Sequence, residues 1–74
     1  MKGITNTNAL EIALIKSKVT KKELASKLGI SLQALYNKLS NETEFKGSEI
    51  AKTTELLKLS KSEREQIFFA GNVE

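Results

Sequence analysis

The sequence has 74 residues, enough for one domain but too few to enclose a large active site, because a chain of this size buries only about 60% of its extended surface. It contains no cysteine and no histidine, so a disulfide, a thiolate nucleophile and an imidazole acting as metal ligand or general base are all excluded. The net charge is +3 and unevenly distributed, with +5 on residues 1–41 and −2 on residues 42–74.

The N-terminal part predicts one helix after a short tail. Residues 1–5 show no periodicity and are assigned no role. The first ten residues lack both the apolar run of a signal peptide and the roughly 20 apolar residues of a membrane span, which indicates a cytoplasmic protein. Asn6, Thr7 and Asn8 are residue types that cap helices, and residues 9–16 place Leu10 and Leu14 on one face. A first helix is therefore expected at residues 9–16.

Residues 20–41, TKKELASKLGISLQALYNKLSN, predict two short helices separated by a glycine. Thr20 and Glu23 have the spacing of a capping box, so the first of these helices begins directly after Thr20. Gly29 stands where a helix end requires a left-handed residue. Ser31 is then placed to cap the next helix, and Ile30 is an apolar residue in the turn between them.

The second helix of this pair has two different faces on a wheel of about 100° per residue. Leu32, Leu35, Tyr36 and Leu39 fall together and predict the packing face. The opposite face contains amides and one cation, which are the groups that make bidentate contacts to base edges in a DNA major groove. Its residues are Gln33, Ala34, Asn37 and Lys38.

The spacing of Leu24-Ala25, Gly29-Ile30 and Leu35 resembles the helix-turn-helix of the Cro and phage-repressor family. Lys21 stands where such proteins often have glutamine, and Lys38 where they usually have an apolar residue. The resemblance implies an all-α, five-helix, lambda-repressor-like DNA-binding domain formed by the whole chain, 1–74. The chain looks most like small regulators of temperate phages of Gram-positive bacteria, including the antirepressors called modulators of repression, and these act inside the bacterial host cell.

The candidate binding residues combine this resemblance with the charge distribution. The basic half contains the motif, and phosphate contacts by lysine are favourable because they release counterions. Lys21 matches the first phosphate-contacting position of the family. The expected DNA-binding or partner-binding residues are Lys21, Ser31, Leu32, Gln33, Ala34, Tyr36, Asn37 and Lys38.

The second half of the chain predicts a loop and two more helices. Residues 40–44, SNETE, contain no apolar side chain, and Phe45 is expected to anchor the chain to the core. A helix beginning at residues 47–49 would bury Ile50, Ala51, Thr54 and Leu57. The last helix follows the capping-box spacing of Ser60 and Glu63, covers residues 63–70 and ends at Gly71. Ile67 and either Phe68 or Phe69 should point inward, because adjacent residues on a helix differ in direction by about 100°.

Three classes of function are compatible with a chain of this kind. An enzyme is the least favoured, because no metal-ligand spacing, phosphate loop, nucleophile motif or defined acid pair is present, and no cofactor is expected. A Cro-like regulator would read operator DNA through the second motif helix. An antirepressor would instead bind the DNA-binding domain of the cognate phage repressor, and the acidic half offers carboxylates for that contact. No dimerisation helix is evident, so a homodimer remains open.

Overall fold

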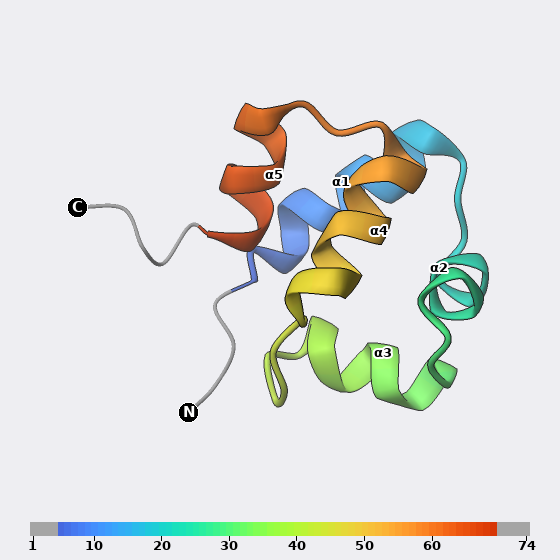
Figure 1. Cartoon of the computed structure of the whole chain (residues 1–74). Helices are drawn as coiled ribbons and strands as arrows, with labels where there is room; N and C mark the ends of the chain where they lie inside the picture. Colours follow the sequence, from blue (N-terminus) through green and yellow to red (C-terminus); the bar gives the residue numbers. More distant parts are fainter. Residues whose placement is uncertain (1–4, 70–74) are drawn as a thin grey trace.

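The computed structural model describes residues 5–69, which fold into five α-helices without a strand (Figure 1). The predicted all-α class is confirmed for these residues. None of these helices is both long and apolar enough to cross a membrane. In chain order the helices are α1 Thr7–Ser17, α2 Lys21–Leu28, α3 Leu32–Leu39, α4 Gly47–Leu57 and α5 Lys61–Phe68.

The predicted capping residues are confirmed, although α1 and α5 begin at Thr7 and Lys61, two residues earlier than expected. In α1, α2, α3 and α5, the side chain of the capping residue accepts a hydrogen bond from a free backbone N–H of the first turn; these residues are Asn6, Thr20, Ser31 and Ser60. The carboxylates of Glu23 and Glu63 complete the boxes by accepting from the backbone N–H of Thr20 and Ser60, each at 2.8 Å. Hydrogen bonds with Ser60, first that of its backbone N–H and second that of its hydroxyl, hold the pKa of Glu63 below its ordinary value.

The turn between α2 and α3 depends on Gly29, which has a φ of 73°. Its backbone N–H and that of Ile30 donate to Ser26 and Ala25 carbonyls at 3.1 and 3.0 Å, so the end of α2 is closed by hydrogen bonds. A Cβ at this glycine would meet no atom within 4 Å, which means that the left-handed backbone, rather than crowding, favours glycine here. Two residues later Ser31 starts α3.

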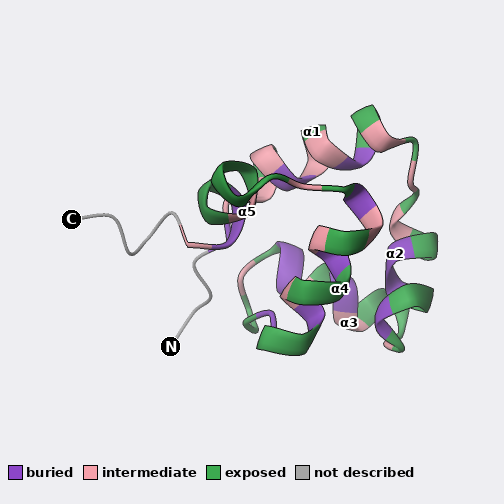
Figure 2. Ribbon diagram, turned by 45° about the horizontal axis from the view of Figure 1, so that its top comes forward, coloured by how far each residue is buried: buried purple, intermediate pink, exposed green. Residues whose placement is uncertain are grey.

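The core lies between all five helices, and Figure 2 shows its buried residues on the inner faces of the ribbon. Phe45, the predicted anchor after the 40–44 loop, is buried, and its ring meets that of Phe68 edge to face with centroids 5.2 Å apart. The loop that follows α3 is thereby fastened to α5. The buried apolar side chains are Leu10, Leu14, Leu24, Ala25, Leu28, Leu35, Leu39, Phe45, Leu57, Ile67 and Phe68.

The last helix ends earlier than expected. Residue Phe68 is the final residue of α5, and the predicted terminator, Gly71, lies outside the described residues. Of the adjacent phenylalanines, Phe68 is buried, and Phe69 is partly buried against the core with the Arg64 guanidinium 5.9 Å from its ring centre. The expectation that Ile67 and one phenylalanine point inward is confirmed.

The residues before α1 are tied to the rest of the fold by hydrogen bonds. The backbone N–H of Thr5 donates to Asn41 Oδ1 at 2.9 Å, and Asn41 Nδ2 donates to the Thr5 carbonyl at 3.0 Å. The next residue, Asn6, donates its backbone N–H to the Ile67 carbonyl at 2.7 Å. The Thr7 hydroxyl donates to the carbonyl of Leu39, the last residue of α3. The start of the described chain therefore joins the end of α3 to α5.

The buried face of α4 differs from the predicted one. Glu49, Thr53 and Leu57 are buried, whereas Ala51 is exposed and Ile50 and Thr54 are only partly buried. The prediction followed the spacing of Ile50, Ala51 and Leu57 and allowed for no buried charge on this helix. Burial of Glu49 is possible because a lysine of α3 forms an ion pair with its carboxylate, and that pairing cannot be recognised from the apolar pattern of α4.

Candidate functional site

The exposed side of α3 contains the two amides that the sequence singled out. Gln33 is exposed, Asn37 is partly exposed, and Gln33 Nε2 donates to Asn37 Oδ1 at 3.2 Å across one helical turn. The two side chains therefore lie side by side and point away from the core. Ser31 Oγ is occupied by the cap, where it accepts from the Ala34 backbone N–H at 3.0 Å, so its role is to start the helix.

Lys38 does not lie on this exposed side, and its assignment as a binding residue is wrong. It is only 7% exposed, and its Nζ is 3.2 Å from Glu49 Oε1 on α4. The same ammonium group donates to the Glu44 carbonyl at 3.0 Å and lies 5.9 Å from the centre of the Phe45 ring. These contacts neutralise and solvate the cation inside the protein, so it is unavailable to phosphate or base.

The packing face of α3 is rotated relative to the predicted one. Leu35 and Leu39 are buried as expected, but Leu32 is 38% exposed and Tyr36 is 45% exposed. With Lys38 inside, the centre of the buried face turns by roughly 60° on the wheel, toward α4. Tyr36 and Leu32 therefore lie at the edge of the amide face, and the exposed surface of α3 is partly apolar.

Lys21 is held between two other helices. Its Nζ lies 3.4 Å from Glu11 Oε2 on α1 and 6.0 Å from the centre of the Tyr36 ring on α3. The side chains of Lys21 and Glu11 are 37% and 44% exposed, so water and a partner can both reach the pair. Lys21, the residue expected to contact phosphate, therefore lies next to α3, but its ammonium group already pairs with a carboxylate of the protein.

Two lysines that were not among the expected binding residues are better placed for phosphate than Lys38. Lys22 and Lys27 on α2 are exposed, and no ion pair joins either to another residue between 5 and 69. Lys22 precedes the capping residue Glu23 in the first turn of α2, where backbone N–H groups also attract anions. The sequence shows only that these lysines belong to the motif. Whether a lysine forms an ion pair depends on the tertiary structure, so the sequence could not single them out.

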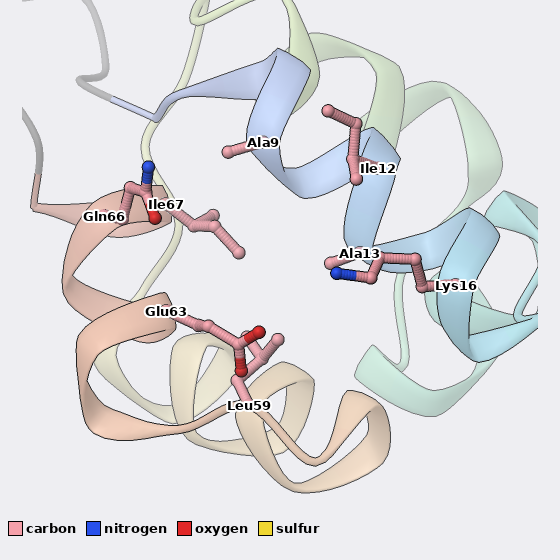
Figure 3. Close-up of a pocket in the computed structure, with 8 residues that line it drawn as sticks. All are labelled: Ala9, Ile12, Ala13, Lys16, Leu59, Glu63, Gln66 and Ile67. Atoms are coloured by element: carbon pink, nitrogen blue, oxygen red, sulfur yellow. The ribbon is translucent and has the colours of Figure 1, made fainter.

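A separate hollow of about 180 Å³ lies between α1 and α5, on a different side of the molecule from α3 (Figures 1 and 3). Its floor is mostly apolar, and Lys16 and Glu63 face each other across one end (Figure 3). This hollow was not predicted. Its lining residues are Ala9, Ile12, Ala13, Lys16, Leu59, Glu63, Gln66 and Ile67.

No cluster of three or more metal-ligating side chains is present among residues 5–69. The candidate surface therefore consists of the amide pair Gln33 and Asn37, the edge residues Leu32 and Tyr36, and the lysines of α2. Such a surface can donate and accept hydrogen bonds, attract anions and bury a modest apolar area.

No protein-family model and no curated protein matches this sequence. The resemblance of residues 20–41 to the helix-turn-helix family therefore rests on the sequence of these residues alone.

Proposed function

We propose that this protein is a small phage-type, Cro-like transcriptional regulator that binds operator DNA through a helix-turn-helix made of α2 and α3. The single observation that carries this proposal is the exposed amide pair on α3, Gln33 and Asn37. Residues of this type at i and i+4 on an exposed helix can read two neighbouring bases, because each amide both donates and accepts hydrogen bonds.

The dimensions of α3 suit this role. Eight residues at 1.5 Å each give a helix about 12 Å long, which can lie across the edges of a few base pairs in a major groove of similar width. The hydrogen bond between Gln33 and Asn37 holds both amides on one side of the helix in the free protein. Less side-chain freedom is then lost when the pair binds base edges.

The charge of the surrounding surface supports a polyanionic ligand. Within the motif, Lys22 and Lys27 on α2 are exposed and have no ion pair with another residue of the described chain, and the half that contains them has a net charge of +5. Because Lys38 is buried, we expect fewer phosphate contacts than the lysine count suggests. The logarithm of the binding constant should still fall with the logarithm of salt concentration, by about 0.9 for each contact.

Alanine substitution of either amide tests the proposal. We expect Gln33→Ala and Asn37→Ala each to weaken binding to the regulatory DNA beside the gene by about 1–3 kcal/mol and to reduce discrimination against unrelated DNA. Thermal unfolding should be unchanged, because neither side chain is part of the core. Fluorescence anisotropy with labelled duplexes measures both quantities. Gln66→Ala, an exposed glutamine on α5, is the matched control; wild-type binding by both α3 variants would refute the assignment.

A second candidate function is favoured by a specific observation. Leu32 and Tyr36 are exposed on α3, and tyrosine is among the residues that most often anchor protein interfaces, here with an apolar neighbour. An antirepressor would place them against the DNA-binding domain of the cognate phage repressor. The acidic half offers Glu42, Glu44, Glu49 and Glu55 for this contact, but Glu49 is buried.

Repressor binding predicts a specific effect of replacing the edge residues Leu32 and Tyr36. If the repressor is the partner, Leu32→Ala and Tyr36→Ala should each weaken the complex by about 2 kcal/mol, because a buried anchor is lost at its centre. Operator binding by the protein alone would then be weak in all variants. Titration of labelled operator and of purified repressor, at low and at physiological salt, separates the cases, and no affinity for either partner at low salt would exclude both.

A further inference from the structure

We propose that Glu11 limits the affinity of this protein for DNA by occupying Lys21 in the free state. The inference rests on the proposed operator binding. It assigns a role in DNA affinity to a residue of α1, outside the motif, and it follows from the position of one ion pair.

The geometry places the Lys21 ammonium group at the junction of three helices. The lysine is the first residue of α2, its Nζ is 3.4 Å from the Glu11 carboxylate of α1, and the exposed Tyr36 ring of α3 lies 6.0 Å away. A DNA backbone that runs along the exposed side of α3 would pass within reach of this lysine. The Glu11 carboxylate thus competes with a phosphate oxygen for the same ammonium group.

The local charge gives Glu11 two ways to oppose a phosphate. Its carboxylate already satisfies part of the hydrogen-bonding capacity of Lys21, and it also repels a second anion brought to the same place. Because the pair is partly exposed, the attraction within it is modest, so DNA can displace the carboxylate. Glu11 is therefore expected to weaken the binding of DNA without abolishing it.

Glu11→Gln tests this role because glutamine keeps the size of the side chain and removes its charge. With a short labelled duplex of the regulatory DNA as the probe, we expect this variant to bind about 1.5- to fivefold more tightly than wild type, the range set by an exposed ion pair. The salt dependence should steepen by up to about 0.9 in slope, because Lys21 becomes free to replace a counterion.

Two further variants separate a local effect from a change in net charge. Glu65→Gln on α5 removes the same charge from an exposed site that has no ion pair with Lys21, and it should leave affinity nearly unchanged. In a Glu11→Gln/Lys21→Gln double variant, measured against Lys21→Gln, the gain should disappear, because the glutamate acts through the lysine.

The outcomes distinguish this inference from the proposed function. If wild type binds the duplex and Glu11→Gln binds it equally well, the role of Glu11 is refuted while operator binding stands. An equal gain in Glu65→Gln, or a gain that persists without Lys21, also refutes it. If neither wild type nor Glu11→Gln binds DNA at low salt, operator binding itself is refuted.

Discussion

Replacing Lys38 with methionine is expected to lower the free energy of unfolding by about 3–5 kcal/mol. The substitution keeps the apolar stem of the side chain but removes the ammonium group that lies 3.2 Å from Glu49 Oε1. The Glu49 carboxylate would then remain buried without a cation, although it still accepts the Lys46 backbone N–H at 2.9 Å. The Glu44 carbonyl would also lose its donor. Urea denaturation of both proteins measures the difference.

A double variant shows whether the uncompensated charge is the cause. In Lys38→Met/Glu49→Gln the amide oxygen still accepts the backbone N–H that starts α4, and no buried charge is left. Most of the lost stability should return, because replacing both members of a buried pair costs far less than removing one. If the single variant is as stable as wild type, Lys38 is not paired inside the protein and its place on the exposed face of α3 would have to be reconsidered.

Leu35→Ala is expected to cost about 2–5 kcal/mol, a large share of the stability of so small a domain. Leu35 is fully buried, and it belongs to the same core cluster as Ala25 of α2. Shortening the side chain leaves a cavity where α3 packs onto α2, in addition to the lost apolar burial. Thermal and urea unfolding report the loss.

Leu32→Ala is the matched control for this substitution. It removes the same atoms from the same helix at a position that is 38% exposed, so no enclosed cavity forms and the cost should be well below that at Leu35. An equal cost at both positions would contradict the observed rotation of α3, and an unchanged melting temperature in Leu35→Ala would contradict the burial of Leu35.

Local sequence signals predicted the helix boundaries well, because caps depend on residues close together in the chain. Thr20, Gly29, Ser31 and Ser60 each act as expected, since a hydroxyl three residues before a free N–H, or a glycine in a left-handed conformation, needs no information about the rest of the fold. Phe45 could also be placed, because it is the first apolar residue after a polar loop.

The orientation of α3 could not be predicted from its own residues. A wheel assigns a lysine to solvent, whereas Lys38 is buried because Glu49, eleven positions later on another helix, supplies the opposite charge. The same pairing turns α4 so that Ala51 is exposed. For the candidate site, this means that the amides were found from the sequence, but the partners of Lys21 and Lys38 required the tertiary structure.

The hydrogen bond from Asn6 to the Ile67 carbonyl has a consequence for synthesis of the protein on the ribosome. The start of α1 leaves the exit tunnel first, and its partner on α5 is added 61 positions later, as the numbers of the two residues show. Until then, the face of α1 that packs against Ile67 has nothing to cover it, and domains of this kind fold as a unit. A nascent chain that stalls before α5 has emerged would expose this apolar face to chaperones and proteases.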